Sequence, residues 1–247
     1  EFTDYDFEGS GMSALLDVLA YNTHYLGFNA NMLANEMFLD SASLRSSIVS
    51  HATTLGYVPT SARASKATVD VSLNTNDASA TMPAGTVFNT TVDDVSFQFS
   101  TIQSFTKSNT GNSIPFTNVD IYEGTFITTR YTVDSSNVDQ RFLLTDNRAD
   151  TTTLTVKVQT SSSDSTTTTY TEATDITQVT ATSNVYYLQE VEAGLFEVYF
   201  GDGVIGRALS DNNIVILTYV VSNKSKANGA AIFTNAATIA SVSDVAV

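Results

Sequence analysis

The feature that most constrains this chain is a change of periodicity near residue 60. Residues 12–38 contain no proline, only Gly27 interrupts them, and their apolar side chains fall at helical spacing. This pattern predicts one helix about 40 Å long, at about 1.5 Å per residue. From Ala67 onward apolar and polar residues alternate, which predicts half-buried antiparallel strands. We therefore expect an α+β protein, with an N-terminal helical hairpin followed by mainly antiparallel β-domains.

The first predicted helix carries apolar residues on two stripes. An ordinary surface helix shows a single apolar stripe, so a helix with two of them needs cover on more than one side. We predict that it docks against partner helices, and the simpler alternative is a plain two-helix core unit. The predicted interface residues are Leu15, Leu19, Tyr21, Tyr25, Leu26, Phe28, Met32, Leu33 and Met37.

A second helix is predicted over residues 44–55, whose apolar positions are again spaced at helical intervals. Asp40 or Ser41 precedes it and has a side chain suited to an N-cap. Gly56 follows as a helix terminator, and Pro59 lies just beyond. The first sixty residues are therefore expected to form a helical hairpin.

The remaining chain is interpreted as strands separated by turn-forming residues. The polar run 161–169 is taken as a loop at the tip of a β-excursion, and not as a flexible linker, because strand-like segments flank it closely. We divide the chain into a helical docking segment (1–60), a β-domain (61–135), a Ser/Thr-rich β-excursion (136–190) and a returning β-segment (191–247). The clearest strand patterns lie at 68–73, 95–99, 126–133, 154–158, 186–188, 196–200, 214–221 and 231–233.

Composition excludes several classes of function. The 11 basic against 26 acidic side chains give a net charge of -15, which disfavours nucleic acid as a partner because phosphate binding depends on Lys and Arg. No stretch approaches the roughly 20 apolar residues of a membrane-spanning helix. The chain lacks an initiator Met and stops in a strand-like run at 239–242, so we expect an excerpt of a longer polypeptide.

No catalytic, metal or cofactor site is predicted. The chain has no cysteine and two histidines, and neither His24 nor His51 has a carboxylate at a ligand spacing. Hydrolase elbows and phosphate-binding glycine loops are absent from the sequence.

Acidic clusters leave two weaker alternatives. The pairs Asp93-Asp94 and Glu190/Glu192 could serve acid/base chemistry, but tryptophan platforms for sugars are missing, and a solvated acidic face is the simpler explanation. The cluster 211–213, with Asp202, could bind calcium, although no EF-hand spacing occurs and local turns explain it as well.

The segment 199–207 is more distinctive because three glycines fall between two strand patterns. Glycine is required where the backbone takes positive φ, so we predict a tight structural turn. Its residues are Gly201, Asp202, Gly203, Gly206 and Arg207. A phosphate cradle is disfavoured, because such a cradle leads into a helix N-terminus and because an aspartate would repel the anion.

Together with this turn, long strings of the chain resemble the baseplate J-like family, and specifically the inner-ring wedge subunits of T4-like contractile-tailed phages. The matching strings cover nearly the whole chain and are specific, whereas 161–169 and 222–226 depart from the family pattern. They lie at 6–25, 34–40, 50–59, 61–64, 83–88, 122–125, 140–144, 200–207 and 214–219.

The resemblance implies a structural subunit of the virion tail baseplate, assembled in the host cytoplasm. Its helices would join a bundle with other wedge proteins and the sheath-initiator subunit, and neighbouring copies would form a ring around the hub. The assembly would rearrange when the sheath contracts. The alternatives are a β-rich adhesin or glycan-binding tail module, which has no evident use for a doubly apolar helix, and a tail-associated glycan hydrolase.

Overall fold

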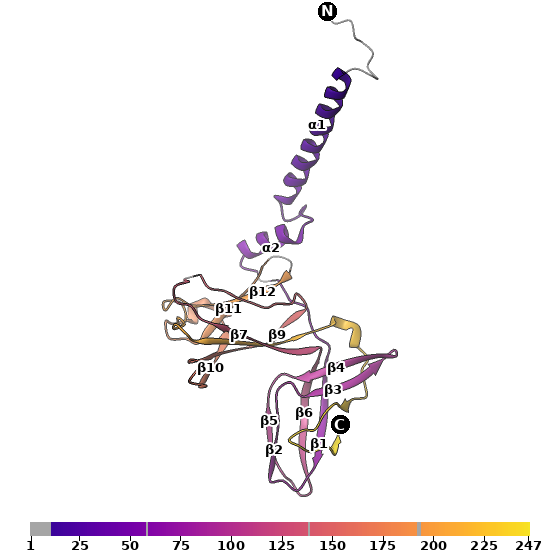
Figure 1. The fold of residues 1–247 in the computed structure, drawn as a ribbon, viewed down its shortest axis with the longest axis vertical. Helices are drawn as coiled ribbons and strands as arrows, with labels where there is room; N and C mark the ends of the chain where they lie inside the picture. Colours follow the sequence, from indigo (N-terminus) through magenta and orange to yellow (C-terminus); the bar gives the residue numbers. More distant parts are fainter. Residues whose placement is uncertain (1–10, 58, 138, 192–193) are drawn as a thin grey trace, which may run out of the picture. The chain divides into compact units, whose positions relative to one another are not determined.

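The computed structural model describes residues 11–57, 59–137, 139–191 and 194–247 (Figure 1). The chain divides into two compact units, Glu1–Pro59 and Thr60–Val247. The first contains the helices and the second contains the strands. The α+β class predicted from the periodicity is confirmed.

The helical unit holds α1 (Gly11–Glu36) and α2 (Arg45–Thr54). The first helix agrees with the predicted 12–38 to within two residues at each end. The predicted N-cap of the second helix was wrong, because the residue preceding α2 is Leu44, which makes no side-chain cap. Neither helix has a buried residue, so the described part of this unit contains no core between its helices.

The β unit is built from two large sheets and one small one (Figure 1). The strands are β1 (Lys66–Asn74), β2 (Ser79–Met82), β3 (Val87–Val92), β4 (Val95–Thr101), β5 (Phe105–Ser108), β6 (Ser113–Glu123), β7 (Thr125–Thr132), β8 (Phe142–Leu143), β9 (Ala149–Gln159), β10 (Thr167–Glu172), β11 (Val185–Glu190), β12 (Phe196–Phe200), β13 (Ile214–Val221), β14 (Thr234–Asn235) and β15 (Val245–Ala246). Two short 3-10 turns, Ile176–Gln178 and Lys224–Ala227, lie between strands.

The six-stranded sheet has the order β14-β3-β4-β6-β1-β15, and all of its pairs are antiparallel. Its core includes Leu73, Phe88, Phe116 and Ile121, all essentially inaccessible to solvent. The small β2-β5 sheet contributes Met82 to the same core. The last residues of the chain therefore complete a sheet that begins at residue 66, and sheet membership does not follow the order of the sequence.

The seven-stranded sheet has the order β7-β13-β9-β10-β11-β12-β8. Only β10 and β11 run parallel; the other pairs are antiparallel. Its separate core includes Phe142, Val198, Leu217 and Tyr219. The run 161–169 lies at the tip of the β9–β10 hairpin as predicted, although β10 already begins at Thr167.

Gly124 carries the chain from one large sheet into the other. Its φ is 125°, and a Cβ there would lie 2.2 Å from the backbone oxygen of Val221, so the strands approach more closely than any side chain permits. Next to this crossing, the buried carboxylate of Glu123 accepts hydrogen bonds from the backbone N–H and the side-chain amide of Asn223, both at 2.8 Å.

Two strand predictions differ from the structure, and one long strand was missed. Residues 231–233 form no strand, and β14 begins at Thr234. The terminal run 239–242 is a tight turn, with Ala240 and Ser241 at positive φ and a bridge between Ile239 and Val242. The long strand β6 was missed because a bulge, with Asn118 at φ 54°, shifts its alternation halfway along.

Candidate partner interface

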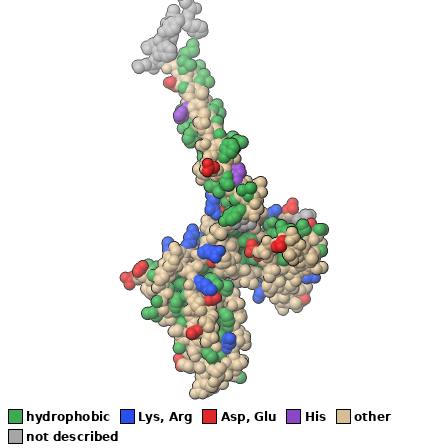
Figure 2. All heavy atoms as spheres, turned by 180° about the vertical axis from the view of Figure 1, so that it is seen from behind, with side chains coloured by type: hydrophobic (Ala, Val, Ile, Leu, Met, Phe, Trp, Pro, Cys, Tyr) green, Lys and Arg blue, Asp and Glu red, His purple; other side chains and the backbone are tan. Residues whose placement is uncertain are grey.

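Helix α1 presents apolar side chains to solvent along its whole length. Leu26 and Leu33 are each 69% exposed, and each of the other large apolar side chains of the helix is at least 40% exposed. Figure 2 shows these side chains along the helical unit. Exposed apolar surface of this extent on a folded protein marks an interaction site. All nine predicted interface residues are exposed; eight belong to α1, and Met37 directly follows it.

The apolar residues of α1 form two seams with a seven-residue repeat. Leu19, Leu26 and Leu33 make one seam, and Val18, Tyr25 and Met32 make the other. Adjacent residues in a helix are rotated by about 100°, so the seams face different directions. A single partner helix covers one heptad seam, so full burial of α1 needs at least two neighbouring helices.

Aromatic side chains concentrate beside the second seam. The ring centroids of Tyr21 and Tyr25 are 4.5 Å apart and inclined by 54°, and His24 lies edge-on to Tyr25 at 6.0 Å. The hydrogen bond with Tyr25 raises the pKa of the Tyr21 hydroxyl. His24 is therefore part of an aromatic group on the helix surface.

The joint between α1 and α2 is held by Glu36, the last residue of α1. Its Oε1 accepts hydrogen bonds from Ser43 N at 2.9 Å and Ser43 Oγ at 2.7 Å, and Leu44 N donates to the same carboxylate at 3.2 Å. His51 Nε2 donates to the Glu36 carbonyl oxygen at 3.0 Å. One carboxylate thus caps the start of α2 from the preceding helix, in place of the expected Asp40 or Ser41.

The Glu36 carboxylate is strongly stabilised in its charged form. The Ser43 hydroxyl, then the Ser43 N–H and the Ser47 hydroxyl, lower its pKa from the ordinary 4.5 to about 2. A negative charge at the N-terminal end of α2 is also favoured by the helix dipole. Sequence reasoning missed this role, because a cap is normally sought immediately before the helix, not eight residues upstream.

The predicted glycine-rich turn is a closed loop after β12. A Cβ on Gly201 would lie 2.2 Å from Ile205 O, and Gly203 and Gly206 both have φ of 89°. Asp202 Oδ1 accepts from Val204 N at 2.9 Å and from Ile205 N at 3.2 Å, and these bonds lower its pKa. The carboxylate therefore binds its own loop, as a structural turn requires.

The same turn is tied to the segment that precedes β11. Gly206 N donates to Thr180 O at 3.2 Å and Arg207 N donates to Ser183 O at 2.9 Å. The Arg207 guanidinium donates to Asn184 Oδ1 at 3.1 Å. At the tip of the glycine-rich turn, Val204 is 72% accessible to solvent. The glycine spacing did not predict this exposed apolar side chain.

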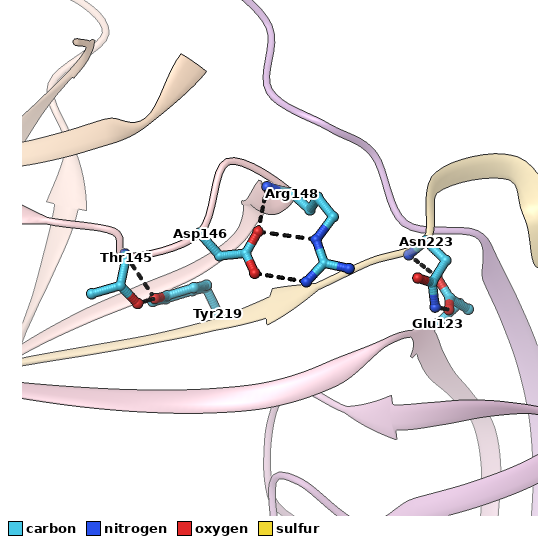
Figure 3. Close-up of polar contacts among 6 residues, drawn as sticks. All are labelled: Glu123, Thr145, Asp146, Arg148, Tyr219 and Asn223. Atoms are coloured by element: carbon cyan, nitrogen blue, oxygen red, sulfur yellow. Dashed lines mark hydrogen bonds and ion pairs between the residues drawn. The ribbon is translucent and has the colours of Figure 1, made fainter. Parts of the chain in front are cut away.

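Three buried carboxylates of the β unit, those of Glu123, Asp150 and Glu197, accept hydrogen bonds. Asp150 accepts from Ala64 N at 2.8 Å and from the N–H and hydroxyl of Thr152. Figure 3 shows Glu123 with Asn223, the pair Asp146–Arg148 joined at 2.8 Å, and Tyr219 Oη with Thr145. The Glu123–Asn223 contact joins the ends of β6 and β13, whereas the Asp146–Arg148 pair lies within one loop.

The other acidic candidates occupy turns or sheet positions. Asp93 and Asp94 have φ of 49° and 63° and form the two-residue turn between β3 and β4. Glu190 ends β11 and is buried, whereas Glu192 lies outside the described residues. Asp211 Oδ1 accepts from Ser135 N, an ordinary loop contact. Nowhere in the described chain do three or more His, Cys, Asp or Glu side chains gather to hold a metal ion.

Comparisons with known proteins agree on one kind of assembly. The family model described as "Baseplate wedge protein gp6-like, helical domain" matches residues 1–57, and "Bacteriophage baseplate wedge protein gp6, third domain" matches residues 126–233. Baseplate wedge protein gp6 of Enterobacteria phage T4 is 29% identical over 264 aligned positions, covering 98% of this chain. The chain spans only 38% of the length of that relative. None of the helices described here is long and apolar enough to span a membrane.

Proposed function

We infer that this chain, with its two matches to domains of gp6-like baseplate wedge proteins, is a structural component of a phage tail baseplate. The two matched regions cover the helical unit and most of the seven-stranded sheet, and the 29% identical relative supports the same family. A location in the virion tail baseplate follows from this homology. The baseplate J-like assignment rests on the matching strings along nearly the whole chain and is part of the proposal.

The observation that carries a structural role is the uncovered surface of α1. Fully burying one large apolar side chain contributes about 1.5–3 kcal/mol. Full burial of nine such side chains would contribute about 14–27 kcal/mol, more than the roughly 4–15 kcal/mol that association costs in lost translational and rotational freedom. We propose that α1 docks into a helical bundle with other wedge proteins and the sheath-initiator subunit, through the nine interface residues predicted from its stripes.

The remaining elements of the proposal concern assembly. Neighbouring copies join into a ring around the hub, and the subunit takes part in tail assembly and in triggering contraction. An assembly that rearranges on contraction needs interfaces with two discrete packings, and a bundle of heptad seams is one such interface. The physical support for these steps is again the exposed surface of α1, together with the gp6-like helical-domain match over the same residues.

An enzymatic role has little support. The matched descriptions all name baseplate wedge proteins. Of the acidic residues that first suggested acid/base chemistry, Asp93 and Asp94 lie in a turn, and Glu190 is buried at the end of β11. The glycan-binding alternative explains the Thr-rich sheets but leaves α1 without a purpose. A gp6-like helical match over residues 1–57 therefore favours the wedge subunit over the adhesin.

Co-purification with neighbouring wedge proteins tests the docking of α1. Replacing Leu26→Asp and Leu33→Asp places two charges in the first seam, and burying an unpaired charge is costly. We expect complex formation to be abolished while the far-UV spectrum of the β unit is unchanged. The matched control, Ala20→Asp with Asn31→Asp, adds the same charges on the polar side of α1. Equal binding by both variants would refute the docking role.

A further inference from the structure

Residues 61–64 are hydrogen-bonded to a sheet other than the one they lead into. They precede β1 of the six-stranded sheet, whereas their partners lie in β9 of the seven-stranded sheet (Figure 1). Ser61 Oγ accepts from Thr151 N at 2.9 Å and lies 2.9 Å from Thr151 Oγ1, and Ala64 N donates to Asp150 Oδ2 at 2.8 Å. We call residues 61–64 the strap, because they connect one sheet to the other.

The partner of the strap in β9 is a buried carboxylate. Asp150 is 1% exposed, and none of the ion pairs between described residues involves it. Its Oδ1 accepts from the N–H and the hydroxyl of Thr152, at 2.9 and 2.6 Å, whereas its Oδ2 accepts from Ala64 N. A buried charge is costly unless its oxygens have hydrogen-bond donors. The strap therefore supplies the donor that Oδ2 needs while Asp150 stays buried.

Polar contacts, and not apolar burial, hold the strap in place. Its sequence, Ser-Ala-Arg-Ala, contains no large apolar side chain, and none of its residues belongs to either core. By contrast, β1 pairs with β6 through eight residues and buries Val71 and Leu73. Burial of apolar surface is the dominant favourable contribution to folding. Detaching the strap from β9 therefore costs much less than detaching β1 from its sheet.

The boundary between the strap and β1 is fixed at Ser65. Glu123 N donates to Ser65 O at 2.8 Å, directly before the first residue pair of β1 and β6. Ser65 Oγ lies 3.0 Å from Lys224 O and 2.6 Å from Asn228 Oδ1, both in the segment that follows β13. These contacts do not involve β9. A strap detached from β9 would therefore leave the chain attached from Ser65 onward.

We propose that the strap is a releasable latch, closed by Asp150 and opening without disruption of either sheet. In the closed state Ala64 N bonds to Asp150. In the open state residues 61–64 leave β9, and water reaches Oδ2 in place of the lost donor, which limits the cost of opening. A released segment of four residues spans at most about 14 Å. The chain enters the β unit at Thr60, so the latch sets how much free chain joins the helical unit to the sheets.

A segment with two discrete arrangements is what a rearranging assembly requires. A pull on the helical unit reaches the strap before it reaches β1, because the strap precedes β1 in the chain. The use of the latch during tail contraction rests on the proposed function. The latch itself is a property of the isolated chain, and it can be tested without any baseplate partner.

Native-state amide exchange of the full, unmodified chain tests whether the strap opens separately. Exchange at Ala64 should be slowed by its bond to Asp150 yet respond little to low urea concentrations, because opening of the strap exposes little apolar surface. Exchange at the hydrogen-bonded amides of β1 should accelerate with urea, since those amides open only with their sheet. An equal dependence on urea at Ala64 and in β1 would overturn the proposal. So would an Ala64 amide that exchanges as fast as in an unfolded chain.

Asp150→Asn tests the group that closes the latch. Asparagine has the same size but a single side-chain oxygen, which cannot serve both Thr152 and Ala64. We expect exchange at Ala64 to accelerate by about ten-fold or more, since a hydrogen bond to a charged group contributes at least that factor, with exchange in β1 unchanged. The matched control is Asp70→Asn, because the exposed Asp70 also accepts from a backbone N–H, that of Asn118 at 2.7 Å. It should leave exchange at Ala64 unchanged, and equal exchange at Ala64 in the two variants would overturn the role of Asp150.

Trypsin gives a second readout, because Arg63 is exposed within the strap. A protease needs a freed segment of chain, so the rate of cleavage after Arg63 follows the population of the open strap. This rate should rise in Asp150→Asn by the same factor as exchange at Ala64, and it should stay unchanged in Asp70→Asn. Cleavage after Arg63 only at urea concentrations that also unfold β1 would overturn the latch. A failure of α1 to bind partners would leave these results unchanged, so the two proposals can fail separately.

Discussion

The helical unit and the β unit differ in whether their apolar side chains are buried. In the β unit, two separate cores bury side chains such as Phe116 and Leu217 completely. In the helical unit, no described residue of either helix is buried, although α1 is at least as rich in large apolar residues. Most helical stability in proteins comes from packing an apolar face, not from helix propensity. The contrast teaches that the strands bury their apolar residues against one another, whereas those of α1 stay exposed, and their burial by partners is a prediction.

The largest expected effect is the loss of stability when a core side chain of the β unit is truncated. A truncation on α1 serves as the comparison. Phe116→Ala removes a fully buried ring, and we expect it to lower the free energy of unfolding by about 3–5 kcal/mol. Leu26→Ala removes an exposed side chain, and we expect a change within about 0.5 kcal/mol for the isolated chain. Urea titration monitored on the β unit measures the first and helical circular dichroism the second. A comparable loss in both variants would show that α1 is already packed within the chain.

The glycine-rich turn gives an intermediate effect within the β unit. Gly203 has φ of 89°, and the space around its Cβ position is open, so the cost of Gly203→Val is backbone strain of about 1–3 kcal/mol. Asp202→Asn retains an oxygen that accepts from the Val204 and Ile205 N–H groups, so we expect a much smaller change. Thermal unfolding of both variants measures this order. A stable Gly203→Val protein that instead fails to bind a ligand would mean that the turn is a binding site.

A smaller effect is expected at the α1–α2 joint as the pH falls. The folded pKa of Glu36 lies near 2, below its ordinary 4.5, so the carboxylate stabilises the joint above its ordinary pKa. That contribution should be lost progressively as the pH falls from about 4.5 through about 2. Amide exchange at Ser43 and Leu44 should accelerate over this window. In Glu36→Gln exchange should be faster already at neutral pH and should lose this pH-dependent step; an unchanged step would assign it to another group.

The smallest expected effect is that of a chelator, which should leave both units unchanged. A metal that binds only the folded state would raise the melting temperature, and its removal would lower it. We expect EDTA to leave the melting temperature of the β unit and the helicity of α1 as they are, and elemental analysis to find no stoichiometric transition metal. A decrease of several degrees with EDTA would reveal a metal site in one of the units.

The sequence predicted the elements whose local pattern is uninterrupted. The boundaries of α1 follow from helical spacing without proline, and those of β12 and β13 coincide with the predicted 196–200 and 214–221. The bulged strand β6 and the two-residue strands could not be predicted in this way, because alternation identifies a strand only over several unbroken residues. The side chains of the candidate interface were all identifiable, since apolar residues at heptad spacing are visible without coordinates. Their contact with a partner stays a prediction.

What the sequence determined by itself is therefore the order of helix and strand and the identity of the apolar residues on α1. Periodicity is a local property, and it sets which faces a segment must bury. Only the tertiary structure decided that residues 234–246 complete a sheet begun at residue 66, that Glu36 caps α2, and that β7 lies at one edge of its sheet. Those outcomes depend on hydrogen bonds between residues far apart in the chain, and such partners are chosen by the packing of all the strands together, not by any one segment.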